Sequence, residues 1–196
     1  MDWKKEYANK IVSVEEAVSH VQSGNRIVFT HACGEAQALT EELVRQADRL
    51  ENVEIVHMVA MGKAPYCQPG MEKHFRHNAL FVGGSTRKAV EEGRGDYTPC
   101  FFHEIPKLFT DGTLPVDVAF LQLSEPDENG VCSYGVSVDY TQPAAEAAKL
   151  VIAQINKNMP YTYGNGINLK DIDYIVEKDE PLIELQPPKI GETEHK

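Results

Sequence analysis

The chain has 196 residues, of which 42% are hydrophobic and 25% charged, a composition typical of one globular domain. Acidic residues outnumber basic ones by 30 to 19, and the net charge of −11 argues against a surface for nucleic acids or anionic membranes. No apolar run approaches the length of a membrane span, and residues 1–6 lack the apolar stretch of a signal peptide. We therefore expect a cytoplasmic protein that binds neither nucleic acid nor membrane.

The first sixty residues predict a helix, a strand, a second helix and a second strand. Ser13 and Glu16 form a capping box, which opens a helix that ends near Gly24. Residues 27–29 and 53–60 are apolar runs typical of buried strands. The helix between them has its apolar residues on one face: Leu39, Leu43, Val44, Ala47 and Leu50. This order implies a parallel sheet with a right-handed crossover.

The rest of the chain continues the alternation of short strands and helices. The expected strands are residues 80–82, 98–102, 116–123, 131–134, 151–155, 174–176 and 182–185. The expected helical segments are a stretch that the loop 83–87 opens and that ends near 92, a turn at 106–109, and 143–149 with Thr141 as its cap. The sequence therefore predicts an α/β fold with an open, mostly parallel sheet flanked by helices.

Four cysteines are spread singly along the chain: Cys33, Cys67, Cys100 and Cys132. No two form a Cys-x-x-Cys pair, which argues against zinc ribbons and thioredoxin-like sites. We expect four reduced, buried thiols. A catalytic thiol is the alternative, although no Cys–His pairing is visible in the sequence.

Ligands of parallel α/β sheets bind in the crevice at the carboxyl ends of the strands. Four segments are expected to lie there: residues 30–36, 61–68, 83–87 and 124–135. Residues 83–87 (Gly-Gly-Ser-Thr-Arg) combine backbone amides, two hydroxyls and a guanidinium, which suits an anion. The alternative is a tight turn in which Ser85 is an ordinary helix cap.

The histidines also leave alternatives open. His74 and His77 lie three residues apart and fit either one face of a surface helix or part of a metal site, but no third ligand is apparent, so we expect no metal. His31 follows a strand, and it fits either a crevice residue or an ordinary hydrogen-bonded histidine.

Residues 116–139 resemble a family of coenzyme A enzymes. The segment 124–137 (Ser-Glu-Pro-Asp-Glu-Asn-Gly-Val-Cys-Ser-Tyr-Gly-Val-Ser) is similar to the acetyl-CoA hydrolase/transferase family, and residues 1–5, 83–106 and 185–192 agree with it. The resemblance covers essentially the whole chain. It implies transfer of CoA between a short-chain acyl-CoA (4-hydroxybutyryl-, butyryl- or acetyl-CoA) and a carboxylate such as acetate.

The resemblance also implies a covalent mechanism in which a glutamate attacks the thioester and then carries CoA as a glutamyl thioester. Family chains have two related α/β halves, and the catalytic glutamate lies in the second. We therefore expect residues 1–185 to be the N-terminal domain and residues 186–196 an interdomain linker, with the second domain absent. No catalytic residue is expected in this chain, which excludes Glu35, Glu104 and Glu125 as nucleophiles, and the chain alone should be inactive.

This half is expected to form one wall of the acyl and carboxylate pocket, with Ser85, Thr86 and Arg87 holding the acceptor carboxylate. The predicted pocket residues are Ala32, Gly34, Met61, Gly62, Ser85, Thr86, Arg87, Ser124, Pro126 and Ser137. Coenzyme A and acyl-CoA are expected as substrates, with no permanently bound cofactor. The expected partners are the short-chain carboxylate, the C-terminal half and, for the full-length protein, a second copy in a homodimer.

Four alternatives remain open. The first is an acyl-CoA hydrolase of the same family, which would differ in how water reaches the thioester. The second is a non-catalytic CoA-binding module. The third is a different enzyme on a related scaffold, such as a sugar-phosphate isomerase, which would use residues 83–87 for phosphate. In the fourth, a separate chain supplies the second half.

Overall fold

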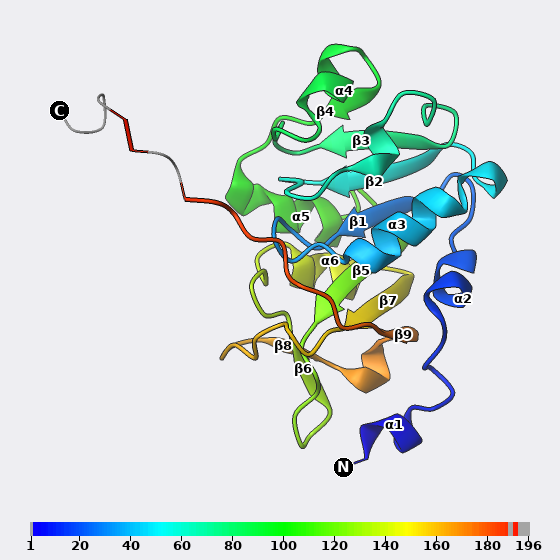
Figure 1. The fold of residues 1–196 in the computed structure, drawn as a ribbon, viewed down its shortest axis with the longest axis vertical. Helices are drawn as coiled ribbons and strands as arrows, with labels where there is room; N and C mark the ends of the chain where they lie inside the picture. Colours follow the sequence, from blue (N-terminus) through cyan, green and yellow to red (C-terminus); the bar gives the residue numbers. More distant parts are fainter. Residues whose placement is uncertain (1, 188–189, 192–196) are drawn as a thin grey trace.

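A parallel sheet of seven strands runs through the centre of the computed structural model, which describes residues 2–187 and 190–191 (Figure 1). Its strands are β1 (Arg26–Phe29), β2 (Val53–His57), β3 (Phe75–Ala79), β4 (Gly95–Tyr97), β5 (Val118–Leu123), β7 (Leu150–Ile155) and β9 (Tyr174–Glu177). Their order is β4-β3-β2-β1-β5-β7-β9, and every neighbouring pair is parallel. A small antiparallel sheet pairs β6 (Val131–Ser133) with β8 (Gly166–Asn168). The predicted α/β fold with a parallel sheet is confirmed.

Helices cover both faces of the large sheet (Figure 1). On one face lie α2 (Val14–Ser19) and α3 (Gln37–Arg45), and on the other α5 (Ile105–Thr110) and α6 (Thr141–Ala147). Strand β1 is apolar on both sides, because Ile27 and Phe29 join the first core while Val28 joins the second. The shorter helical elements are α1 (Trp3–Glu6), α4 (Arg87–Glu91), η1 (Ala47–Arg49), η2 (Pro65–Cys67), η3 (Phe102–Glu104) and η4 (Leu169–Asp171).

The predicted helix cap at Ser13 is confirmed. The Ser13 side chain accepts a hydrogen bond from the Glu16 N–H at 3.0 Å. The helix ends at Ser19 rather than near Gly24, since the chain turns there toward β1.

Two strand predictions in the middle of the chain are wrong. The strand expected at 80–82 is β3, which ends at Ala79, and the strand expected at 98–102 is β4, which ends at Tyr97. Strand β3 was missed because its residues are polar where a buried strand is usually apolar. Asn78 donates to Glu54 Oε1 at 2.8 Å and accepts from the Thr98 hydroxyl at 2.8 Å, so hydrogen bonds replace apolar contacts between these strands.

The same correction applies to the histidine pair. His77 lies in β3, with Nδ1 3.2 Å from the Ile55 carbonyl, and His74 precedes the strand, with Nδ1 2.8 Å from the Leu50 carbonyl. They share no helix face, so the expected surface helix is wrong.

Residues 182–185 do not form the expected strand. The sheet already ends at β9, and the chain instead turns across the carboxyl ends of the strands (Figure 1). Glu180 fastens this turn: its Oε1 accepts from Gln154 Nε2 at 2.7 Å, and its backbone carbonyl accepts from Asn156 Nδ2 at 2.8 Å. Of the predicted linker 186–196, only residues 186–187 and 190–191 are described, and they contain no helix or strand; the rest lies outside the described residues.

Replacing Gly135 with Ala should cost about 2–4 kcal/mol of unfolding free energy. Gly135 has φ of +62°, and a Cβ there would overlap the side chain of Met159, which is buried. Urea denaturation measures the loss. Gly24→Ala is the matched control, because Gly24 has φ of +79° with open space around it, so only the backbone cost of about 1 kcal/mol should appear. Equal losses in the two variants would contradict the steric part of the argument.

Candidate functional site

The strand order indicates a candidate binding site between β1 and β5, and we call the edge formed there by the carboxyl ends of the strands the crevice. From β1 the chain adds β2, β3 and β4 on one side, whereas β5, β7 and β9 lie on the other. In open parallel sheets, ligands bind at the carboxyl ends of the strands where the order reverses in this way. The loops after β1, β2, β3 and β5 all begin at this edge, as the sequence predicted.

The loops after β1 and β2 touch each other at this edge. Ala32 forms an isolated parallel bridge with Ala60, and its N–H donates to the Val59 carbonyl at 3.1 Å. Ala32 has φ of +53°, a left-handed conformation that costs energy without glycine and that clusters at functional sites. Met61 follows the bridge and is 38% exposed.

Gly34 and Ser137 also lie together. A Cβ on Gly34 would be 3.1 Å from the Ser137 Cβ and 2.8 Å from the Thr30 Cγ2, so only glycine fits between them. The structure thus brings together two predicted pocket residues that are far apart in the sequence.

In the predicted anion-binding segment 83–87, the three polar side chains have different surroundings. The Ser85 hydroxyl donates to the Ala60 carbonyl at 2.6 Å, which ties this loop to the loop after β2. Thr86 is fully buried, and its hydroxyl has no hydrogen-bond partner among the described residues. Arg87 is exposed and makes no ion pair within the described part of the chain. Because α4 has only five residues, an anion here would depend mainly on Arg87 and Ser85 rather than on a helix dipole.

Ser124 and Pro126 lie in the turn between β5 and β6. The Ser124 hydroxyl accepts from the Ser133 N–H at 2.9 Å and donates to the Glu125 carbonyl at 2.9 Å, so the side chain is engaged within the turn. Pro126 is half-buried. No hydrogen bond found in residues 2–187 joins either residue to the loops after β1, β2 or β3.

An Asp–His pair lies at the same edge, and the sequence did not identify it. His31 Nδ1 is 2.8 Å from Asp139 Oδ2, and the Ser137 hydroxyl donates to the same oxygen at 3.0 Å. Burial alone would raise the pKa of Asp139, but the hydrogen bond and charge of His31, together with the Ser137 hydroxyl and the Tyr140 N–H, hold that pKa below its usual value. The other ring nitrogen of His31 is buried without a partner among the described residues. Of the two alternatives for His31, both the location at the crevice and the hydrogen bond are thus observed.

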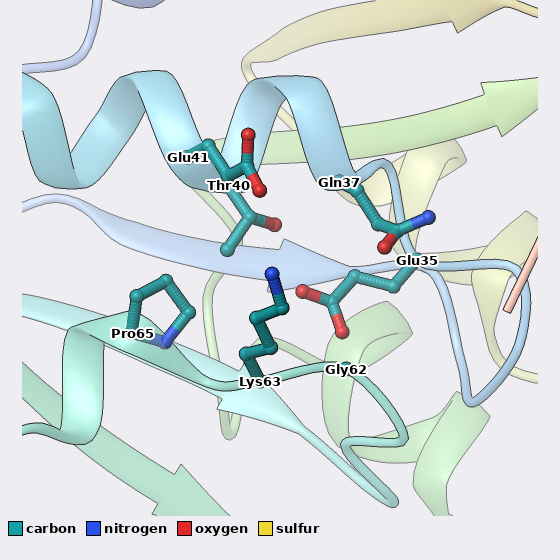
Figure 2. A pocket seen from close by; sticks show the side chains of 7 residues that line it. All are labelled: Glu35, Gln37, Thr40, Glu41, Gly62, Lys63 and Pro65. Atoms are coloured by element: carbon teal, nitrogen blue, oxygen red, sulfur yellow. The ribbon is translucent and has the colours of Figure 1, made fainter. Parts of the chain in front are cut away.

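Glu35 lines a small cavity between α3 and residues 62–65 (Figure 2). The cavity has a volume of about 80 Å³, and the Glu35 side chain is 2% exposed. Burial raises the pKa of Glu35 to about 7, while hydrogen bonding by the Thr40 hydroxyl and the Gly62 N–H opposes the rise. A carboxyl enclosed in this way cannot reach a thioester from this cavity.

The cysteines are all free, but only Cys67 and Cys132 are buried, whereas Cys33 and Cys100 are half-buried. The expectation that all four are buried is therefore wrong for two. Burial raises the pKa of the Cys67 and Cys132 thiols to about 12, which leaves them protonated and weakly nucleophilic.

In the described residues, no group of three or more His, Cys, Asp or Glu side chains is arranged to hold a metal ion. No helix within residues 2–187 combines the length and the apolar character needed to cross a bilayer.

Together the parallel sheet and its crevice define an α/β domain with a candidate ligand site where the strand order reverses. Residues 1–186 match the N-terminal domain of acetyl-CoA hydrolase/transferase enzymes, and the chain belongs to this family. The family expected from the sequence is thus confirmed.

Individual relatives agree with this assignment. Over 195 residues the chain is 60% identical to a 4-hydroxybutyrate coenzyme A transferase from Clostridium kluyveri, a match that covers 99% of this chain and 46% of the relative. It is 31% identical to a butyryl-CoA:acetate CoA-transferase from Anaerostipes caccae, covering 93% of this chain and 42% of that protein. A crystal structure of a 4-hydroxybutyrate CoA-transferase from Porphyromonas gingivalis superposes with a TM-score of 0.80 at 36% identity, covering 96% of this chain and 44% of that one. The chain therefore spans about half the length of the curated relatives it matches.

Proposed function

We propose that this chain is the N-terminal half of a CoA-transferase that moves CoA between a short-chain acyl-CoA and a carboxylate. The observation that carries this proposal is the similarity to the Clostridium kluyveri enzyme, which extends over almost the whole chain. The preferred acyl groups in this proposal are 4-hydroxybutyryl, butyryl and acetyl, with acetate as an acceptor. The nucleophilic glutamate comes from the second half.

Exposed apolar side chains around the crevice support the proposal that a second domain covers this edge of the sheet. The side chains of Met61, Phe81, Phe102, Val136 and Val138 are all exposed. Exposed apolar groups that gather around one edge are typical of a surface that another domain covers. Residues 1–185 would then be the first domain and residues 186–196 the linker to the second.

In this proposal the crevice supplies the acyl and carboxylate wall. The residues of that wall come from the loop after β1, the loop after β2 and the segment after β6: Ala32, Gly34, Met61, Gly62 and Ser137. Arg87 and Ser85 would hold the acceptor carboxylate by charge-assisted hydrogen bonds. Thr86 is turned inward, so its contribution would be to the packing of this loop. The homodimer and the cytoplasmic location stay predictions.

A chimera tests the proposal directly. Residues 1–186 of this chain would replace the equivalent residues of the Clostridium kluyveri relative, so that its C-terminal half supplies the remainder. The chimera should transfer CoA from butyryl-CoA to acetate, whereas the 196-residue chain alone should not. A folded chimera that releases CoA equally fast without acetate would favour the hydrolase, and one that binds CoA without turnover would favour a binding module.

Within that chimera, Arg87→Met should raise the KM for acetate by about tenfold, because a partly exposed charge-assisted contact of about 1.4 kcal/mol is lost. The KM for butyryl-CoA should change little. Lys88→Met is the matched control, since Lys88 is the next residue, is exposed, and pairs with Glu92 at 3.7 Å. An unchanged KM for acetate in Arg87→Met would overturn the assignment of Arg87 as the carboxylate-binding residue.

A further inference from the structure

Glu35 is a buried carboxyl at the crevice that neither the fold nor the proposed nucleophile accounts for. Its side chain is 2% exposed, and Oε2 has no hydrogen-bond partner among the described residues. Figure 2 shows the Glu35 carboxyl and the Lys63 amine pointing into the same space between α3 and residues 62–65. No ion pair joins Glu35 to Lys63 in the described part of the chain.

The carboxyl is pressed against the backbone of Gly62. A Cβ on residue 62 would be 2.6 Å from Glu35 Oε2, 3.1 Å from Cδ and 3.2 Å from Oε1. Real Cβ atoms do not approach another atom this closely, so residue 62 must be glycine for the carboxyl to occupy its place. The Glu35 carboxyl thus fills the space that a side chain on residue 62 would need.

The backbone of Glu35 is in turn fixed to the sheet. Gln122, in β5, donates from Nε2 to the Glu35 carbonyl at 2.8 Å and to the Gly34 carbonyl at 3.3 Å. Asn156 donates to Gln122 Oε1 at 2.6 Å and so orients its amide. Both amide side chains are fully buried, which makes this network rigid. The loop after β1 therefore has little freedom to move away from Gly62.

The loop after β2 is irregular between His57 and η2, and it is then anchored by Ala64, Tyr66 and Cys67, which are buried in the core. It has no strand beyond His57, and Ala64 adopts a left-handed conformation with φ of +45°. It meets the loop after β1 at the bridge from Ala60 to Ala32 and where Gly62 lies against Glu35. Met61 lies between these two points.

We propose that Glu35 is a positioning residue: its carboxyl holds the Gly62 backbone and thereby fixes Met61 at the wall of the acyl pocket. This role for Met61 rests on the proposed function, whereas the contact of Glu35 with Gly62 does not. The Glu35 carboxyl changes its charge near neutral pH, because burial raises its pKa to about 7. The charged groups that face it are Glu41 and Glu180, which raise that pKa further, and Lys63 across the cavity.

Hydrogen exchange in the 196-residue chain tests the contact without any need for activity. In Glu35→Ala, the Gly62 and Lys63 amides should exchange at least about tenfold faster than in the wild type, because the loop loses its support. Glu35→Gln keeps the shape of the side chain, so these amides should exchange within about threefold of the wild-type rate. The matched control is Glu41→Ala, which removes an exposed carboxyl from the same cavity and should change nothing. Unchanged exchange in Glu35→Ala would overturn the proposal.

Kinetics in the chimera test the consequence for the pocket. Glu35→Ala should raise the KM for butyryl-CoA by about tenfold and change kcat by less than about threefold, with rescue by Glu35→Gln. Gly62→Ala should give the same rise in KM, because its Cβ displaces the carboxyl from the opposite side, and it substitutes for Glu35→Ala if that variant does not fold. A loss of kcat that Glu35→Gln does not rescue would instead make Glu35 a catalytic residue and overturn the positioning role. If the chimera is inactive, the proposed function fails, while the exchange result still decides whether Glu35 holds Gly62.

Discussion

Acidification from pH 6.5 to 4 is expected to lower the free energy of unfolding by about 3 kcal/mol through His77 alone. His77 is 2% exposed, and burial lowers its pKa from 6.5 to about 4, although the hydrogen bond to the Ile55 carbonyl opposes this. Between these pH values the unfolded chain binds a proton at this residue and the folded chain does not. The contribution of His77 to the free energy of unfolding is therefore fully present above pH 6.5 and is lost as the pH falls toward 4.

Two other buried groups affect the same pH range. Burial also lowers the pKa of His57 well below its usual value, so His57 adds to the loss in acid. Glu35 acts in the opposite direction, because its folded pKa of about 7 lies above the usual 4.5. Between pH 4.5 and 7 the folded chain holds the extra proton at Glu35, and its contribution to stability decreases as the pH rises.

His77→Gln isolates the contribution of this histidine. The variant keeps an N–H donor for the Ile55 carbonyl and removes the titrating ring, so its stability should depend on pH less steeply than that of the wild type by up to about one proton, or 1.4 kcal/mol per pH unit. Urea denaturation between pH 4.5 and 7.5 measures both slopes. His103→Gln is the control, since His103 is exposed. Parallel pH profiles for wild type and His77→Gln would show that His77 is not buried in its neutral form.

Asp139→Asn is expected to destabilise the chain by about 2–3 kcal/mol at pH 7. The carboxylate accepts hydrogen bonds from His31 Nδ1 at 2.8 Å, the Ser137 hydroxyl at 3.0 Å and the Tyr140 N–H at 2.6 Å. An amide has one acceptor oxygen and an NH₂ group that only donates, so at least one of these donors loses its partner. The same substitution should loosen His31 at the crevice.

The pH dependence of this loss provides a second readout. Because the folded pKa of Asp139 is depressed, its contribution to stability is present above the unfolded value of 3.8 and is lost as the pH falls through the folded value. The difference between wild type and Asp139→Asn should therefore shrink in strong acid. Asp111→Asn is the matched control: Asp111 lies at the surface and accepts a local hydrogen bond from Thr113, so its replacement should change stability much less than Asp139→Asn does. Equal losses in the two variants would contradict the argument for Asp139.

The elements that could be predicted from the sequence are those whose buried positions hold apolar residues. Strands β1, β5 and β7 are mostly apolar, with one polar residue each (Arg26, Gln122 and Gln154), and their positions were predicted to within two residues. Strand β3 was missed because Arg76, His77 and Asn78 carry polar groups, which are satisfied by neighbours on β2 and β4 that only the tertiary structure brings near.

The candidate site likewise has features that the sequence predicts and features that it does not. The crevice and its loops follow from the order of strands and helices, because the carboxyl ends of parallel strands share one edge. The pairs that define its geometry do not: His31 and Asp139 are 108 residues apart, and nothing near either residue in the sequence indicates the other. A signal for Glu35 was available in hindsight, since a carboxyl among the small residues of 30–36 is unusual, but its contact with Gly62 depends on how two loops pack.

The path of residues 178–187 has a consequence for how a second half would reach the site. Glu180 accepts hydrogen bonds from Gln154 and, at 3.3 Å, from the Ala38 N–H, and Pro181 accepts from Gln37 at 3.2 Å, so the segment is fastened beside the loop after β1. A domain joined to the chain after this fastened segment would search only a limited volume around the crevice, which raises its local concentration there. A weak interface between the two halves would then be enough to keep the crevice covered, and it could open for substrate entry without the halves separating.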